Sequence, residues 1–340
     1  MDFKNILVIR LSSLGDIVRL VPTLKTLKEN CQRLVFLTED RFSEIAGMYP
    51  FYDEVIFFPR KNLNLKNLIN FFKGLRKEDY DLTLDLHGIF KSAILEKLTK
   101  TKSNMGYPKK FSKEFAHIFY KEKIFCGKNP SISRFERYNF ALKHLNLKIE
   151  NQEKFYQPLI SQEAKDFSEK FLKENKLEDR NFAFLFVGAS LKQKFKRWPL
   201  FRFKELAFEL KDKMNLEPIF AYGPDEMELE RQLRSHFLTL PPLNLMKTAS
   251  IILRSSLFVG ADTGLMHLAA ISGIKTVAVM GATNPLINKP YGNKSAIVYK
   301  EGIFLECGGE NCPHKNCMGK ITQKDVLEKI KELFENQDAL

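Results

Sequence analysis

Apolar runs of strand length alternate with stretches of helical periodicity along both halves of the chain. In the first half, an amphipathic helix is predicted over about residues 16–29, because its apolar positions recur every three or four residues. In the second half, helices are predicted over about 199–214 and 226–235. The expected strands are residues 5–10, 34–38, 54–58, 81–86, 182–187, 218–222, 237–239, 256–259 and 276–280.

Alternating strands and helices are typical of parallel sheets covered by helices on both faces. A chain of 340 residues is long for one core, so two domains are expected. We place them at residues 1–158 and 159–320, followed by a C-terminal amphipathic helix at 321–340 that Thr322 and Asp325 cap. The prediction is two doubly wound α/β domains facing a cleft, with ligands at the carboxyl ends of the strands.

Charge and hydropathy limit the classes of partner and the location that are expected for this protein. No apolar run is long enough to span a bilayer, and the N-terminus lacks the order of a signal peptide, so a cytoplasmic protein is expected. The net charge is +13, with ten lysines against three glutamates over residues 91–128 and a second basic run at 192–204. These runs are either solvated faces or contacts for phosphate-bearing partners. No nucleic-acid-binding signature accompanies them, so an anionic membrane surface is favoured over nucleic acid.

Three cysteines cluster near the C-terminus. Cys307, Cys312 and Cys317 are spaced five apart, with His314 among them. A structural zinc site usually carries its thiols as C-x2-C, so we expect packed thiols in an irregular loop and no bound metal.

The stretch from Val259 to Ala270 predicts a strand end, a tight turn and a helix start. Asp262 and Thr263 stand where a helix is capped, and Gly264 allows a close backbone approach. Free amide groups and the helix dipole make such a turn an anion site, although capping alone would also explain both residues. His267 lies one turn further, either in the same pocket or simply packed in the core.

The first strand-to-helix turn carries Ser12, Ser13, Gly15 and Asp16. A dinucleotide-binding turn requires G-x-G-x-x-G, so a nicotinamide or flavin cofactor is not expected. Asp16 either complements the helix dipole or serves as a general base for a hydroxyl.

Two loops of the second half suit a nucleotide diphosphate. Ser190 follows the strand at 182–187, and the basic residues at 192–197 lead into Trp198 at a helix start. Lysine charge and a serine hydroxyl suit phosphate, although the loop could equally be solvated. Asp225 follows the next strand, where a ribose could be held.

These segments together resemble glycosyltransferase family 9, the lipopolysaccharide heptosyltransferases. The resemblance rests on S-S-L-G-D at 12–16, D-L-T-L-D-L-H-G at 81–88, R-F-E-R-Y at 134–138, K-R-W-P at 196–199, G-A-D-T-G-L-M-H at 260–267 and the late cysteine stretch. It implies the GT-B architecture, with an N-terminal Rossmann-like domain for the acceptor and a C-terminal one for the nucleotide sugar. It also implies inverting transfer that depends on neither a cofactor nor a metal.

The same resemblance implies residue roles. Asp16 matches the catalytic base. The donor ADP-heptose would contact Ser190, Lys196, Asp225, Asp262, Thr263, Gly264 and His267. The acceptor, a Kdo or heptose of lipid A–Kdo or the lipopolysaccharide core, would contact Ser13, Gly15, His87, Lys91 and Arg137. The loop before Lys196 is long, so Lys192 or Lys194 could take its place.

The sequence thus predicts a heptosyltransferase at the cytoplasmic face of the inner membrane. One alternative is a family member that uses another nucleotide sugar for capsule or O-chain synthesis. Another, of a different class, is a non-catalytic α/β protein that binds anionic lipid or polysaccharide.

Overall fold

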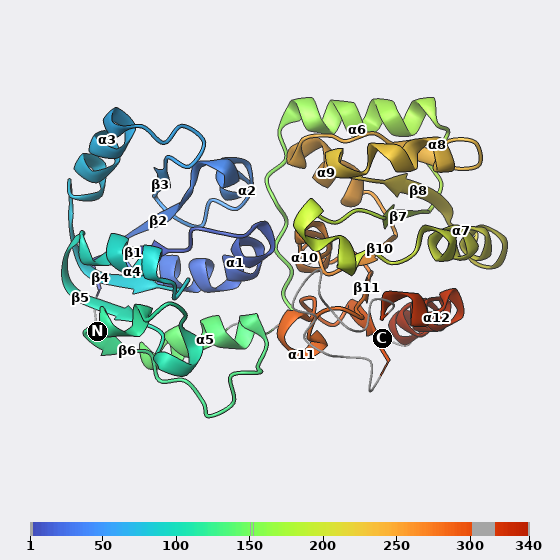
Figure 1. The fold of residues 1–340 in the computed structure, drawn as a ribbon. Helices are drawn as coiled ribbons and strands as arrows, with labels where there is room; N and C mark the ends of the chain where they lie inside the picture. The colour runs from blue at the N-terminus through green and yellow to red at the C-terminus, as the bar shows by residue number, and fades with distance from the viewer. Residues whose placement is uncertain (1–2, 150, 152, 301–316, 339–340) are drawn as a thin grey trace. The chain divides into compact units, whose positions relative to one another are not determined.

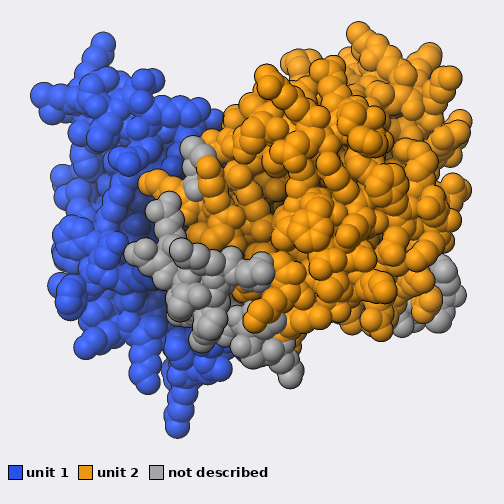
Figure 2. Space-filling view, turned by 45° about the vertical axis from the view of Figure 1, so that its right-hand side comes forward, with its two compact units in different colours: residues 1–151 blue, residues 152–340 orange. Residues whose placement is uncertain are grey.

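A computed structural model describes residues 3–149, 151, 153–300 and 317–338. The chain divides into two compact units, Met1–Asn151 and Gln152–Leu340 (Figure 2). Each unit is an open, wholly parallel sheet of six strands with helices packed against it (Figure 1). This confirms the expected α/β class.

The first unit has the strand order β3-β2-β1-β4-β5-β6. This is the 3-2-1-4-5-6 order of a Rossmann fold, whose switch point lies between β1 and β4. Residues 6–9 of β1 are fully buried because both sheet faces are covered, as in parallel sheets generally. The strands are β1 (Asn5–Ile9), β2 (Arg33–Glu39), β3 (Glu54–Phe58), β4 (Asp79–Asp85), β5 (Lys100–Gly106) and β6 (Glu122–Lys123).

In this unit, helix α1, which follows β1, packs against α5, the last helix of the unit. Helix α3 contacts β3, the edge strand of the sheet, and adds to a core that also takes side chains of β1 and β2. The helices are α1 (Leu14–Glu29), α2 (Ser43–Met48), α3 (Leu65–Leu75), α4 (Phe90–Lys97) and α5 (Arg134–His144), with short 3-10 turns η1 (Asp40–Phe42), η2 (Lys109–Phe111) and η3 (Ala116–Ile118).

The second unit repeats the same topology. Its order β12-β11-β10-β7-β8-β9 becomes 6-5-4-1-2-3 when the strands are counted from β7, so its switch point lies between β7 and β10. The strands are β7 (Phe182–Phe186), β8 (Glu217–Ala221), β9 (Leu238–Leu240), β10 (Leu257–Ala261), β11 (Thr276–Val279) and β12 (Ser295–Val298).

One face of this sheet is covered by α7 and α12, whose apolar side chains share a core with β7 and β10. Trp198 at the start of α7 is buried there and donates its indole N–H to the Ile321 carbonyl. The helices are α6 (Gln162–Glu174), α7 (Leu200–Met214), α8 (Glu230–Leu233), α9 (Leu245–Ile252), α10 (Gly264–Ile271), α11 (Pro285–Asn288) and α12 (Gln323–Asp338), with η4 (Leu191–Lys196), η5 (Pro224–Leu229) and η6 (Met318–Lys320).

The units divide between Asn151 and Gln152, whereas the sequence analysis drew the boundary after Pro158. Tyr156 and Gln157 donate hydrogen bonds to the carbonyls of Ile271 and Ser272, which ties them to the second unit. Helix α12 also belongs to this unit. The expected cap at its start is present, since Thr322 and Asp325 exchange backbone-to-side-chain hydrogen bonds.

Two expectations about secondary structure were incomplete. The helix expected over 226–235 is a 3-10 turn followed by one turn of α-helix, with Glu226 outside helical geometry. Strands β5, β6 and β12 were missed. Strand β5 has the polar sequence K-T-K-S-N-M-G and is partly solvated next to the sheet edge, while β6 and β12 are edge strands of only two and four residues.

Candidate functional site

The predicted site residues of the first unit gather at its switch point. Strands β1 and β4 are hydrogen-bonded neighbours, with Ile9 opposite Asp85. The chain leaves β1 into the turn that carries Ser13, Gly15 and Asp16, and leaves β4 into the turn that carries His87. Because parallel strands end at one edge, the fold brings these two turns together.

Asp16 stands in the first turn of α1 and caps it. Ser13 is the N-cap residue, and its backbone N–H and hydroxyl donate to Asp16 Oδ2 at 3.2 and 3.1 Å. The Gly15 carbonyl accepts from Arg19 Nε at 3.1 Å. Asp16 therefore takes part in capping α1, but these contacts account for only part of its environment.

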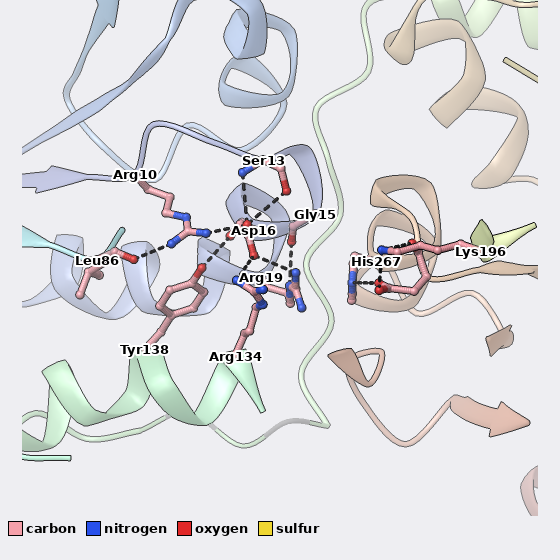
Figure 3. A network of polar contacts seen from close by, with 11 residues as sticks. Arg10, Ser13, Gly15, Asp16, Arg19, Leu86, Arg134, Tyr138, Lys196 and His267 are labelled. Atoms are coloured by element: carbon pink, nitrogen blue, oxygen red, sulfur yellow. Dashed lines mark hydrogen bonds and ion pairs between the residues drawn. The ribbon is translucent and has the colours of Figure 1, made fainter. Parts of the chain in front are cut away.

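Three arginines surround the Asp16 carboxylate (Figure 3). Arg10 Nη2 lies 2.5 Å from Oδ2, while Arg19 Nη2 and Arg134 Nη1 lie 2.8 and 3.3 Å from Oδ1. The Asp16 side chain is only 9% exposed. Burial by itself raises the pKa of this carboxyl, but the three guanidinium groups outweigh burial and hold the pKa well below its ordinary value.

Each arginine comes from a different part of the unit. Arg10 directly follows β1 and also donates to the Leu86 carbonyl at 2.8 Å. Arg19 belongs to α1 and Arg134 begins α5, and these two helices pack together. Sequence reasoning missed all three as partners of Asp16. The R-F-E-R-Y segment carried the signal for Arg134, but the contact with Asp16 depends on how α5 packs.

His87 is held uncharged beside this cluster. Burial lowers its pKa to about 2, aided by the positive charges of Arg10, Arg134 and Lys91. Its backbone N–H donates to Asp85 Oδ1 at 2.8 Å. His87 is therefore a neutral hydrogen-bonding group at any physiological pH.

The buried carboxyl of Asp85 organises the turn after β4. It accepts from Ser92 Oγ at 2.6 Å, from Tyr120 Oη at 2.7 Å and from the Gly88 amide at 3.0 Å. Gly88 has a φ of +73°, which favours glycine. The sequence analysis quoted this segment without giving Asp85 a role. Its place as the last residue of a buried strand was the signal that could have found it.

The other two predicted acceptor residues are tied to neighbours away from Asp16. Lys91 Nζ forms an ion pair with Glu39 at 2.8 Å and lies over the Phe58 ring. Arg137 packs over the rings of Tyr107 and Phe111, and burial lowers its pKa. Both still interact electrostatically with this region. Lys91 is among the charges that lower the pKa of His87, and Arg134 and Arg10 are among those that lower the pKa of Arg137.

In the second unit, the D-T-G turn follows β10 as expected. Thr263 is the N-cap of α10, and its hydroxyl accepts from the Met266 amide. Asp262 Oδ2 forms an ion pair with Lys196 Nζ at 3.0 Å, and Asp262 Oδ1 lies 3.4 Å from Nε2 of the buried His267 (Figure 3). The structure thus brings four predicted donor residues together: Lys196, Asp262, Thr263 and His267.

Lys196 is the member of its loop that reaches Asp262. It is largely buried, whereas Lys192 and Lys194 are exposed. Ser190 caps η4 and is exposed, and Gly264 opens α10. Asp225 is half-buried in the turn after β8.

A residue absent from the sequence predictions connects these turns. The buried Glu226 accepts through Oε1 from the Ala189 amide at 3.0 Å and from Arg197, and through Oε2 from the Gly223 amide at 2.8 Å. A Cβ on Gly188 or Gly223 would lie 2.7 or 2.8 Å from Oε2. Glu226 therefore clamps the turns after β7 and β8 to the basic loop, and both glycines make room for it.

Among the described residues, no three His, Cys, Asp or Glu side chains gather as metal ligands would. Cys307, Cys312 and His314 lie outside the described residues, and Cys317 is buried with a free thiol.

Comparison with known proteins gives a consistent match. A family model described as glycosyltransferase family 9 (heptosyltransferase) matches residues 68–317. Lipooligosaccharide heptosyltransferase 2 of Campylobacter jejuni is 28% identical over 334 residues, covering 95% of this chain and 96% of that protein. Lipopolysaccharide heptosyltransferase 1 of Campylobacter coli is 24% identical over 352 residues, covering 97% and 99%.

Solved structures share the fold. The family 9 glycosyl transferase of Veillonella parvula superposes with a TM-score of 0.79 at 19% identity, covering 98% of both chains. Escherichia coli heptosyltransferase WaaC with ADP superposes with a TM-score of 0.75 at 23% identity, covering 96% of this chain and 99% of that one. These matches confirm the expected fold class, the GT-B type built from Rossmann-like domains.

Proposed function

Since the chain belongs to glycosyltransferase family 9 and is a glycosyltransferase, we propose that it transfers a heptose from ADP-heptose to a sugar hydroxyl of the lipopolysaccharide inner core. The observation that carries this proposal is the pair of switch points. One presents a carboxylate among arginines, and the other presents a helix N-terminus beside a lysine. The first suits an anionic sugar acceptor and the second a diphosphate leaving group.

The donor diphosphate is proposed to bind at the N-terminus of α10. The amides of Gly264 and its neighbours point out of the helix there, and the helix dipole favours negative charge. Lys196 adds a cation at the same turn, where its present partner is Asp262. As the sugar leaves, charge grows on the diphosphate, and donors already in place stabilise it without reorganisation.

The nucleoside is proposed to lie over the turns that Glu226 clamps. Ser190 would donate to a phosphate oxygen, and Asp225 would accept from the ribose hydroxyls. His267 and Asp262 would complete the site beside Thr263. Because Glu226 holds both turns from beneath, these groups are positioned before the donor arrives.

Asp16 is proposed as the general base that deprotonates the acceptor hydroxyl. Its low pKa keeps it ionised, but a carboxylate held by three guanidinium groups accepts a proton weakly. An acceptor that carries acid groups, such as Kdo, would draw arginines toward its own carboxylate. Each arginine so drawn removes a charge from Asp16 and raises its pKa, so the acceptor itself would activate the base.

The other predicted acceptor residues take their proposed roles from their places at the carboxyl end of the first sheet. Ser13 and Gly15 shape the turn, neutral His87 would hydrogen-bond a sugar hydroxyl, and Lys91 and Arg137 would add attraction for acidic groups. The hydroxyl oxygen attacks the anomeric carbon as the bond to ADP breaks, which inverts that centre. The proton passes to Asp16, and ADP leaves with the bonding electrons.

The test is mass spectrometry of the products formed from ADP-heptose and a Kdo–lipid A acceptor. We expect the acceptor to gain the mass of one heptose, with release of ADP. Transfer only from a different nucleotide sugar would overturn the donor assignment. No product from any sugar nucleotide, together with binding of the acceptor alone, would favour the non-catalytic alternative.

A further inference from the structure

Helix α3 and the loop before it, residues 60–77, form a surface with an unusual composition. The segment carries six cations and no acidic residue. All six cationic side chains are exposed, and none of them forms an ion pair with an acid in the described part of the chain. They are Arg60, Lys61, Lys66, Lys73, Arg76 and Lys77.

Two acids lie next to the segment, and neither forms an ion pair with one of its cationic side chains. The carboxylate of Asp40 accepts hydrogen bonds from the Lys61 backbone N–H at 3.1 and 3.0 Å. Glu78, directly after the segment, forms an ion pair with Arg33 at 2.7 Å. The positive charge of the segment is therefore left facing solvent.

Apolar side chains are exposed among these cations. Leu63, Leu65 and Ile69 are 52%, 75% and 46% exposed. They are not the face with which α3 packs on its own unit, because Phe71 and Leu75 already fill that role in the core. Scattered exposed apolar residues are ordinary, but three on one short segment beside unpaired cations are not.

The periodicity of α3 puts both kinds of residue on one side. Leu65, Ile69 and Lys73 follow each other at four-residue steps, so they form one row along the helix, and Arg76 is the C-cap residue directly after it. A helix with an apolar strip bordered by lysine and arginine is suited to the interface of an anionic bilayer.

We propose that α3 and its loop, residues 60–77, are the element by which this protein binds an anionic phospholipid surface. The cations attract the headgroups, and Leu63, Leu65 and Ile69 enter the boundary of the acyl chains. No described helix has the length and apolar composition to cross a bilayer, so this contact is peripheral.

The exposed side chains favour lipid over nucleic acid. Single-stranded nucleic acids bind to exposed aromatic rings that stack with bases, but the exposed apolar residues of this segment are aliphatic. Its aromatic residues, Phe71 and Phe72, pack against the core.

The basic run at 91–128, which the sequence analysis singled out, is less suited to binding an anionic membrane. Lys91 and Lys102 are ion-paired with Glu39 and Asp81. Exposed acids, Glu114 and Glu122, also interrupt the run. The run also exposes Phe115, Ile118 and Phe125, but these acids and ion pairs offset part of its positive charge, so its lysines serve as the comparison that tests which segment binds.

The position of the segment connects lipid binding with the proposed function. This connection, unlike the lipid binding itself, depends on the proposed function. Arg60 and Lys61 follow β3, whose carboxyl end lies at the same sheet edge as the Asp16 turn. Lipid binding there would hold the edge that receives a membrane-borne acceptor close to the bilayer.

The experiment is sedimentation of the full chain with vesicles of equal parts phosphatidylglycerol and phosphatidylcholine, and with phosphatidylcholine alone. We expect binding to the anionic vesicles only. The triple change Lys66→Gln, Lys73→Gln and Arg76→Gln should lower the partition coefficient about a hundredfold, at about fivefold for each cation. The double change Leu65→Ser and Ile69→Ser should lower it at least about tenfold.

The control changes the same number of exposed lysines, Lys109→Gln, Lys110→Gln and Lys113→Gln, and should leave binding nearly intact. All substituted positions are exposed, and an unchanged melting temperature checks that each variant folds. Three results would overturn the proposal. They are a larger loss of binding in the control variant, unchanged binding in both α3 variants, and binding of the full chain to a single-stranded oligonucleotide that is tighter than its binding to the vesicles. The vesicles contain no sugar donor or acceptor, so these results do not depend on whether the protein transfers heptose.

Discussion

Replacing Asp16 by asparagine tests whether its carboxylate is both a structural centre and the proposed base. The substitution keeps the shape of the side chain and removes its charge. Arg10, Arg19 and Arg134 would then face one another around a neutral amide. Breaking a buried ion pair costs about 3–5 kcal/mol, because the remaining charge is left buried without its partner. We expect a loss of this size in the free energy of unfolding at pH 7.

The pH dependence of this loss follows from the sign of the pKa shift. The pKa of Asp16 in the folded protein lies below its unfolded value, despite burial, because of the three arginines. Its contribution to stability is therefore complete above an unfolded pKa of about 4, and it disappears as the pH falls through the folded pKa. The difference between the wild type and Asp16→Asn should accordingly shrink in acid.

Equilibrium urea unfolding of the two proteins, followed by circular dichroism from pH 7 to acid, measures both quantities. Ser13→Ala is the matched control. It removes a neutral donor from the same carboxylate oxygen, and should cost only about 1 kcal/mol, with a much smaller pH dependence than Asp16→Asn because all three arginines remain. A variant as stable as the wild type at pH 7, or a difference that acid leaves unchanged, would refute the reasoning.

The chemical role has its own readout in the same variant. Asp16→Asn should retain ADP binding, because the proposed donor site belongs to the other unit. It should lose heptose transfer by at least about a hundredfold, the lower range for acid–base catalysis. Near-normal turnover in a folded Asp16→Asn protein would remove Asp16 from the role of base.

Three further predictions follow from the contacts described above. Glu226→Gln should lower the free energy of unfolding by about 1–3 kcal/mol, because one acceptor for the Ala189 or Gly223 amide becomes a donor. It should also weaken ADP binding measured by calorimetry, and an unchanged ADP affinity would limit Glu226 to a packing role. Lys196→Ala should weaken donor binding while leaving acceptor binding unchanged, and equal effects on both would contradict its assignment. The pKa of His87 is lowered to about 2, so below pH 6.5 the unfolded chain binds a proton that the folded protein does not. Relative to His87→Gln, the free energy of unfolding of the wild type should therefore fall by about 1.4 kcal/mol for each unit that the pH drops below 6.5, as measured by urea unfolding. The same pH dependence in both proteins would refute this.

The elements of the fold could be predicted where a local pattern reports burial. The apolar runs at 5–10 and 276–280 became strands with little change in their bounds, because buried parallel strands are apolar throughout. The polar strand β5 and the four-residue edge strand β12 were not predicted, because hydrogen bonding to a neighbouring strand, more than their own sequence, makes them strands.

In the candidate site, too, contacts between neighbouring residues could be predicted and contacts between distant residues could not. The caps at Thr263 and Thr322 could be read locally, since a cap and its partner amide are three residues apart. Glu226 could not be assigned from its neighbours. Its partners Ala189 and Arg197 are far away in the chain, and only the parallel pairing of β7 and β8 brings their turns together.

The sequence by itself determined the α/β class, the family, the turns and the residue types that suit a sugar nucleotide. These depend on periodicity and on short motifs, which are properties of neighbouring residues. The tertiary structure decided which charges meet. Asp16 is held by the arginine that follows β1, one from α1 and one from α5. Its pKa depends on all three, because electrostatic interactions follow distance in space and not separation along the chain.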